Sequence, residues 1–292
     1  MLKKGVKKGR KKPMLVSLGV LLIIIGAVLV WFYIPYSPMK QQFSNDLAGL
    51  KSEGSIYTGE VFTENDFKDM PQVIQKYIEY CGYIGKPKMP FLTVEFHNVK
   101  FMQGRDGPAL KMDYMNCNTV KQSNRIALMN SSIFGAPFEG YDYYIDGKGG
   151  MKGVIGKAIT LFHQTGAEMD KGGLVTYLGE CLVMPSSLLQ DFITLEEISD
   201  LRVKSTITYY GISVSGIFTF NEAGEATSFY SEDRPCVTTD GSVESVGWSE
   251  LYEDYQLDEN GIKYPTHLKA IWNYEDGDFV YFDGKISSIS YD

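Results

Sequence analysis

The chain has 292 residues and is 44% hydrophobic, so it can form one large domain with a core of its own. Its formal net charge of −8 is unevenly distributed, because seven of the 28 basic residues and none of the 36 acidic ones lie in residues 1–12. The rest of the chain is strongly acidic, which excludes a nucleic-acid-binding surface, since such surfaces use basic residues to neutralise phosphates.

Residues 14–34 form an uncharged apolar run of 21 residues, which as a helix roughly spans the hydrocarbon core of a bilayer. The basic cluster before this run predicts a cytoplasmic tail at 1–13 and a single-pass cell membrane protein whose main domain is extracytoplasmic. A cleaved signal peptide is the alternative interpretation. It is disfavoured because the run is longer than a signal core and no small-x-small cleavage site follows it.

The segment 35–60 contains Pro, Ser, Gly and polar residues without sustained periodicity, which predicts a stalk before an extracytoplasmic domain at 61–292. At the start of that domain, Thr63 followed by Asp66 is typical of a helix cap. A further helix is expected after this cap and should end at Gly82. The apolar residues at helical spacing in it are Val73, Ile74, Tyr77, Ile78 and Cys81.

From Met89 onward the hydrophobic period changes from helical to alternating, which predicts antiparallel strands in series. One long helical segment, residues 170–190, interrupts the strands, and a tight hairpin turn is expected at Asp283-Gly284. The predicted fold class is therefore α+β: a transmembrane helix, then a large curved antiparallel sheet, half-barrel-like, crossed by a central helix. The predicted strands include residues 91–102, 109–121, 125–133, 141–145, 159–164, 201–209 and 212–220.

Five segments carry a resemblance: MPQVIQKYIEYCG at 70–82, GYDYYIDGKGGM at 140–151, GGLVTYLGECLVMPSSLL at 172–189, EDRP at 232–235 and the C-terminal series from GWSELYEDYQ to ISSISY at 247–291. In this order they resemble an uncharacterised family of bacterial proteins known only as a domain of unknown function, over about residues 68–292. The resemblance implies no activity. The family's helix motif is Arg-Tyr-Leu-x-Glu with a later Pro; here Tyr177, Leu178, Glu180 and Pro185 match it, Thr176 replaces the Arg, and Gly247-Trp248 replaces the family's Pro-Trp.

Glu180 is the one acid within the apolar helical run at 174–189. An acid beside a buried stripe needs a counter-charge, because an unpaired buried charge is costly. Arg234, which precedes Pro235 in a predicted turn, is the expected partner, and this pair either ties the helix to the sheet or takes part in ligand binding. Tyr177, which lies beside Glu180 on the helix, and Trp248 complete the predicted site.

No complete catalytic, metal or cofactor set can be assembled from the sequence. There is no G-x-S-x-G elbow, and His97, His163 and His267 lie far apart without an H-x-x-x-H pattern. His267 alternates with lysines, which predicts a solvent-facing position. The acid-rich stretch 250–259 lacks the spacing of an EF-hand loop and is expected to be a solvated strand face and turn. Catalytic residues, metals and cofactors are therefore not predicted.

The cysteines leave two interpretations open. An extracytoplasmic compartment permits disulfides, and four cysteines allow three pairings that the sequence cannot rank. A domain with its own core does not require such bridges, so buried free thiols are the alternative. The residues concerned are Cys81, Cys117, Cys181 and Cys236.

Two functions are compatible with these features. The favoured one is a binding module whose sheet and helix form an apolar trough for a lipid or a lipoprotein acyl chain beside the membrane. Such an arrangement is similar, at the level of the fold alone, to half-barrel carriers that shuttle lipoproteins in bacterial envelopes. The alternative is an envelope hydrolase that uses Glu180 with Asp233 or Arg234, which would require paired groups at a defined separation.

Overall fold

The computed structural model describes residues 11–53, 59–238 and 241–291, and the chain divides into two compact units, 1–37 and 38–292. Most of the predicted basic tail lies outside the described residues. Helix α1 (Lys11–Tyr33) belongs to the first unit, and no other helix in the described ranges is long and apolar enough to cross a membrane. Its apolar side chains are exposed, as that of Ile23 is by 73%, which is the state of a helix that lipid would cover.

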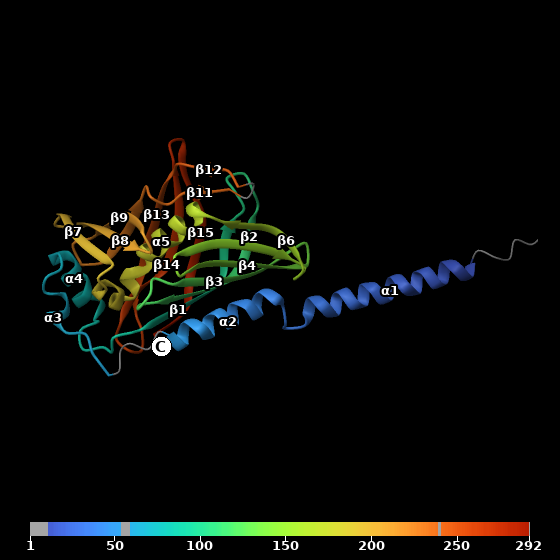
Figure 1. Cartoon of the computed structure of the whole chain (residues 1–292), viewed down its shortest axis with the longest axis horizontal. Coiled ribbons are helices and arrows are strands. Elements are labelled where there is room, and N and C mark those ends of the chain that lie inside the picture. The colour runs from blue at the N-terminus through green and yellow to red at the C-terminus, as the bar shows by residue number, and fades with distance from the viewer. Residues whose placement is uncertain (1–10, 54–58, 239–240, 292) are drawn as a thin grey trace, which may run out of the picture. The chain divides into compact units, whose positions relative to one another are not determined.

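The second unit is built on one antiparallel sheet of 13 strands (Figure 1). The strand order is β6-β5-β4-β3-β2-β1-β15-β14-β13-β10-β9-β8-β7, so three meanders join edge to edge, and β11 and β12 pair separately. The strands are β1 (Phe91–Met102), β2 (Ala109–Thr119), β3 (Arg125–Ile133), β4 (Ala136–Ile145), β5 (Lys148–Ile155), β6 (Ile159–Thr165), β7 (Ile193–Ser199), β8 (Arg202–Tyr209), β9 (Ile212–Phe220), β10 (Ala226–Ser231), β11 (Cys236–Val237), β12 (Val243–Glu244), β13 (Gly247–Leu257), β14 (Lys263–Tyr274) and β15 (Gly277–Tyr291).

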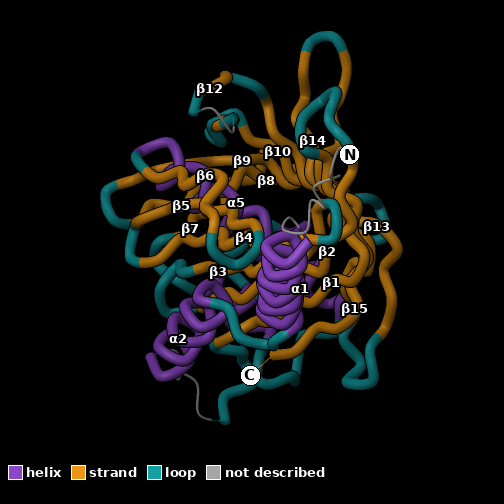
Figure 2. Tube along the Cα trace, turned by 90° about the vertical axis from the view of Figure 1, so that its right-hand side faces the viewer, coloured by secondary structure: helices purple, strands orange, loops and turns teal. Residues whose placement is uncertain are grey.

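Helix α5 (Ala167–Glu180) reveals how strongly this sheet is curved. It packs against β4, β5 and β6 at one end of the strand order and against β8 and β9 at the other. Both ends can contact one helix only if the sheet curls around it, and Figure 2 shows α5 among these strands. Twist accumulated over many strands produces such curvature. The predicted α+β fold, a curved antiparallel sheet crossed by a helix, is confirmed.

Because the sheet encloses α5, every residue from Leu174 to Gly179 is buried. The predicted helical segment at 170–190 is shorter in the structure, since α5 ends at Glu180 and two 3-10 turns follow, η1 (Cys181–Val183) and η2 (Pro185–Leu189). Proline explains this change, because Pro185 has no N–H to donate and its ring would clash with the preceding turn of a continued helix.

The helices before the sheet agree with the sequence pattern. Thr63 caps α3 (Glu64–Phe67) in a capping box with Asp66, and α4 (Gln72–Cys81) ends at Gly82, whose φ of 76° suits glycine. The five apolar residues predicted at helical spacing are all buried in the main core, which α4 shares with the sheet and α5.

The segment 35–60 is not an irregular stalk. It contains α2 (Pro38–Glu53), which belongs to the compact unit of the sheet and packs against β2, β3 and β4. The helix buries Met39, Phe43 and Leu50 in a cluster with Tyr141. With Leu47, which packs against the same cluster, these helix residues recur at helical spacing, a pattern that the many polar residues around them obscured. Burial against the surface of the sheet stabilises the helix.

Two further expectations differ from the structure. The hairpin turn predicted at Asp283-Gly284 is wrong, because Gly284 lies within β15 opposite Leu268, and β14 turns into β15 before Gly277. Glycine is used at 284 for space, since an added Cβ would meet the rings of Phe282 and Phe96 at 3.0 and 3.1 Å. Strand β5 was not predicted, because its glycines obscure the alternating pattern.

Candidate functional site

A cavity of about 130 Å³ lies between α5 and the middle strands of the sheet. Most of its wall is apolar or aromatic, and its polar groups include two arginines and three acids. The apolar and aromatic lining is Leu92, Val94, Phe96, Phe101, Tyr114, Met129, Met151, Val183, Trp248, Tyr252, Leu268, Ala270, Tyr281, Phe282, Ile286 and Ile289, and the polar lining is Asn116, Arg125, Asp142, Thr176, Glu180, Arg234, Glu250 and Lys269.

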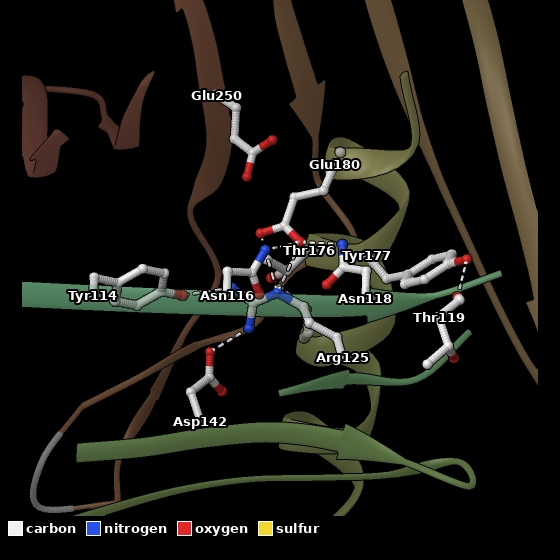
Figure 3. A network of polar contacts seen from close by, with 12 residues as sticks. Tyr114, Asn116, Asn118, Thr119, Arg125, Asp142, Thr176, Tyr177, Glu180 and Glu250 are labelled. Atoms are coloured by element: carbon white, nitrogen blue, oxygen red, sulfur yellow. Dashed lines mark hydrogen bonds and ion pairs between the residues drawn. The ribbon is translucent and has the colours of Figure 1, made fainter. Parts of the chain in front are cut away.

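Glu180, the last residue of α5, is held by three side chains from neighbouring strands (Figure 3). Asn116 and Asn118 on β2 donate through Nδ2 to its Oε2 at 3.0 and 2.7 Å. Arg125 at the start of β3 donates through Nε to both carboxylate oxygens, at 3.1 Å to Oε1 and 3.0 Å to Oε2. Since alternate residues of a strand face the same side, Asn116 and Asn118 reach the helix together.

Arg125 is the centre of this network, with a side chain that is only 4% exposed. Its Nη1 donates to Oδ2 of Asp142 at 2.7 Å, and its Nη2 donates to the Tyr114 hydroxyl at 2.6 Å. Burial alone would lower the pKa of Arg125, but Glu180, Tyr114 and Asp142 raise it well above its usual value. A buried cation with this many acceptors fixes the helix to β2, β3 and β4.

Glu180 therefore has Arg125 as its partner in place of the predicted Arg234. Within the described residues, no ion pair or hydrogen bond joins Glu180 to Arg234. Arg125 was not predicted as a site residue. The sequence carries one signal for it, because Arg125 begins a strand that continues with apolar residues, and a charge beside a buried strand needs a partner.

Arg234 occupies another part of the cavity wall, in the loop after β10. Its guanidinium lies over two neighbouring indoles, 4.6 Å from the ring centroid of Trp248 and 4.9 Å from that of Trp272. Its Nε donates to Oγ1 of Thr176 at 3.0 Å. Thr176, which stands where the resembling family has an arginine, thus contacts an arginine from a distant loop.

The other two predicted site residues have different surroundings. Trp248 is 1% exposed, lines the cavity and donates through Nε1 to the Tyr281 hydroxyl at 3.0 Å. Tyr177 is fully buried and does not line the cavity; its hydroxyl donates to the carbonyl oxygen of Thr119 at 2.8 Å. The structure therefore brings Glu180, Arg234 and Trp248 to one cavity and places Tyr177 in the packing between α5 and β2.

Glu250 on β13 was expected on a solvated face, but it lines the cavity. The Tyr252 hydroxyl lies 3.1 Å from its Oε2, and Figure 3 shows Glu250 near Glu180 without a direct bond to it. Burial and the Glu180 charge raise the pKa of Glu250 to about 8, against the opposing effect of Arg125 and Arg234. Much of this carboxyl is therefore protonated at neutral pH. The sequence predicted a solvated position for Glu250 because the acids that follow it in the chain are typical of an exposed face.

Asp233, the second residue of the hydrolase alternative, does not line the cavity. It accepts hydrogen bonds from the backbone N–H of Ser215 at 2.8 Å and from Nζ of Lys171 at 2.9 Å. Burial raises the pKa of Asp233, but these partners outweigh it and lower the pKa overall. The structure thus separates Asp233 from the cavity that Glu180 and Arg234 share.

Histidine and cysteine side chains add no reactive group to the cavity. His267 is only 15% exposed, contrary to expectation, because Asp283 and Glu253 flank its ring at 2.6 and 3.1 Å. All four cysteines are buried free thiols, and burial raises the pKa of Cys81 to about 12. Across the described ranges, no group of three His, Cys, Asp or Glu side chains is arranged to hold a metal ion.

The fold and the cavity define a class of protein: an α+β domain, preceded by a helix able to cross a membrane, whose curved sheet and central helix enclose a mainly apolar cavity with charged groups in its wall. Within that class, the family of unknown function DUF6544 matches residues 60–284, and the chain belongs to this family. The family assignment confirms the resemblance found in the sequence. None of the curated proteins matches the sequence.

Two solved structures are similar to the chain. One is described as an outer membrane lipoprotein-sorting protein domain from Vibrio parahaemolyticus, with 9% identity and a TM-score of 0.41 over 75% of this chain and 91% of that one. The other is a DUF1329 family protein from Desulfovibrio piger, with 8% identity and a TM-score of 0.40 over 80% of this chain and 94% of that one.

Proposed function

We propose that this protein is a membrane-anchored binding protein that holds a lipid or another apolar ligand between α5 and the sheet. The observation that carries the proposal is the cavity itself, which lies against the main core and has a largely apolar wall. Protein interiors are otherwise close-packed, because an unfilled apolar space forfeits dispersion contacts. A ligand that filled the cavity would restore those contacts.

The size of the cavity limits what it holds. Drug-sized ligands occupy pockets of about 300 to 1,000 Å³, whereas this cavity measures about 130 Å³. An apolar cavity of about 150 Å³ binds a molecule the size of benzene. The cavity therefore takes one end of an acyl chain or a short amphiphile, and the remainder of a longer ligand extends beyond it.

The proposal includes the topology expected from the sequence. The uncharged run of α1, its exposed apolar side chains and the basic residues ahead of it support a single span with the domain at 38–292 outside the cytoplasm. The membrane is then the first partner of the protein and the source of its ligand. An alkaline phosphatase reporter, which is active only outside the cytoplasm, should be active when it is fused after Asp292. If the topology is reversed, a reporter that is active only in the cytoplasm should be active at that position instead.

Hydrolysis has weaker support than binding. Each oxygen of Glu180 is engaged by Arg125, and the asparagines of β2 add two further bonds. These bonds occupy the carboxylate within the protein, which leaves it little capacity to contact a substrate. Asp233 lies outside the cavity, so the Glu180 and Asp233 pair is not assembled there, and Glu180 and Arg234 both line the cavity but share no hydrogen bond or ion pair among the described residues.

The test is binding of decanol, an uncharged chain compound, to the full chain in phosphatidylcholine nanodiscs. Trp31→Phe leaves Trp248 and Trp272 as the only indoles, and Trp248 lines the cavity, so tryptophan fluorescence reports on binding there. We expect a saturable change at micromolar decanol. Ala270→Phe, which adds a ring at the cavity wall, should abolish the change.

The matched control is Ala223→Phe, which adds the same ring at an exposed turn and should leave binding intact. A saturable change that persists in a folded Ala270→Phe variant would place the ligand outside the cavity. No saturable change in any variant would contradict the proposed function.

A further inference from the structure

Arg234 has binding capacity that the protein does not use. Its guanidinium contacts the indoles of Trp248 and Trp272, and its Nε donates to Oγ1 of Thr176. Its Nη1 and Nη2 make no hydrogen bond within the part of the chain that the structure describes. An arginine whose orientation is fixed while its terminal nitrogens stay available loses little conformational entropy when it binds an anion.

Arg234 also has no direct ion-pair partner among the described residues. The carboxylates of Glu180 and Asp142 both bind Arg125 and not Arg234. The remaining acid in the wall, Glu250, holds its proton over much of the neutral range. A mainly apolar wall strengthens the attraction of an anion to a cation in contact with it, because little water screens the charges.

A second unpaired polar group lines the same cavity. Asn116 is 4% exposed, and its Oδ1 has no hydrogen-bond partner among the residues that the structure covers. Its Nδ2 donates to Glu180, which fixes which end of the amide is the acceptor. A buried acceptor without a partner is costly, so the polar part of the cavity is incomplete without a ligand or water.

Apolar side chains from adjacent strands continue the wall beyond these polar groups. Leu92 and Val94 on β1 share the lining with Leu268 on β14 and Ile286 on β15. This distribution suits a molecule with one charged end and one hydrocarbon end, since each part then meets groups of its own kind.

We propose that Arg234 binds the anionic head group, a carboxylate or a phosphate, of a single-chain amphiphile whose hydrocarbon lies along the apolar wall. The inference rests on the proposed binding function and specifies the ligand class. Nη1 and Nη2 form the free edge of the guanidinium, which matches two oxygens of either anion. The contacts with the Trp248 and Trp272 rings and the bond to Thr176 hold the guanidinium in place.

The experiment compares chain compounds of equal length but different heads: decanoate, decyl phosphate and decanol. Each is titrated at pH 7 into the full-length Trp31→Phe protein in phosphatidylcholine nanodiscs, with partition into the lipid measured on empty nanodiscs. We expect the better of the two anions to bind at least about tenfold more tightly than decanol, as charge-assisted hydrogen bonds provide. The anion that binds more tightly identifies the head group.

Arg234→Met should remove this preference and lower the affinity for that anion at least about tenfold, to the level of decanol, whose own affinity should not change. Arg234→Gln, which keeps a polar amide beside the indoles, should do the same and guards against a folding defect in the first variant. Arg105→Met is the matched control: Arg105 lies 4.3 Å from the Tyr274 ring centroid, but it pairs with Asp276 and does not line the cavity, so the preference should remain.

The outcomes separate the inference from the proposed function. If the folded wild-type protein binds decanol and both anions equally, or if the anion preference persists in the folded Arg234 variants, the role of Arg234 is wrong and the binding cavity stands. If none of the three compounds binds, the proposed function fails and the inference fails with it.

Discussion

Two arginines line one cavity, and their surroundings differ. Arg125 is enclosed, and each of its three guanidinium nitrogens donates to a group of the protein, Glu180, Asp142 or Tyr114. Among the described residues, Arg234 donates only to Thr176 and otherwise contacts the rings of two indoles. An arginine whose charge is paired with carboxylates of the protein maintains the fold, whereas an arginine without such a partner at the same cavity is available to a ligand.

The largest expected effect comes from removing the paired arginine. Arg125→Met leaves the Glu180 and Asp142 carboxylates without their cation, so the free energy of unfolding should fall by about 3 to 5 kcal/mol. Urea denaturation followed by circular dichroism measures it. Adding Glu180→Gln to Arg125→Met should cost less than the sum of the two single changes. A variant as stable as the wild type would show that Arg125 is not structural.

The second prediction concerns the pH dependence of stability. Because the pKa of Glu250 is raised to about 8 in the folded state, the folded protein keeps a proton that the unfolded chain releases above its ordinary value near 4.5. The free energy of unfolding should therefore fall as the pH rises through this window, by at most about 1.4 kcal/mol per pH unit from this group.

Glu250→Gln should remove that slope and make the protein more stable than the wild type at pH 8. Glu259→Gln, at an exposed position, is the control and should leave the slope unchanged. Urea denaturation at intervals from pH 5 to pH 8 supplies the comparison. An unchanged slope in Glu250→Gln would mean that another group dominates the dependence.

A smaller effect is expected at the edge of the Arg125 network. Tyr114→Phe removes the hydroxyl that accepts from Nη2 of Arg125, so one donor of a buried cation loses its partner. The cost should be about 1 to 3 kcal/mol. Tyr264→Phe, whose hydroxyl has no hydrogen bond among the described residues, should cost less than about 0.5 kcal/mol. If both substitutions lowered the free energy of unfolding equally, the Tyr114 hydroxyl would not contribute to the Arg125 network.

The smallest expected quantity is the coupling between Glu180 and Arg234. Since they share no hydrogen bond, Glu180→Gln and Arg234→Met should be additive within about 0.5 kcal/mol in a double-mutant cycle. The Glu180 and Arg125 cycle should give a larger coupling. A coupling of similar size in both cycles would show that the cavity acts as a single charged unit and that the contrast between its arginines is false.

Much of the fold follows from local pattern. The limits of β1 and β3, the cap at Thr63 and the end of α4 at Gly82 could be predicted, because side-chain alternation and capping chemistry act over a few residues. Helix α2 was missed although Met39, Phe43, Leu47 and Leu50 recur at helical spacing, because the polar residues around them are typical of a linker. The sequence pattern at Gly284 predicts a turn, but the glycine is required there because a side chain would clash with neighbouring rings.

The candidate site divides in the same way. The sequence alone determined that Glu180 requires a counter-charge, because an apolar helical run around an acid implies burial. The tertiary structure alone decided that the partner is Arg125, 55 residues earlier in the chain, and that Arg234 contacts two indoles and has no ion-pair partner among the described residues. The physical reason is that strand order and the curl of the sheet bring acceptors to one arginine and aromatic faces to the other, and neither property is encoded in the residues adjacent to them.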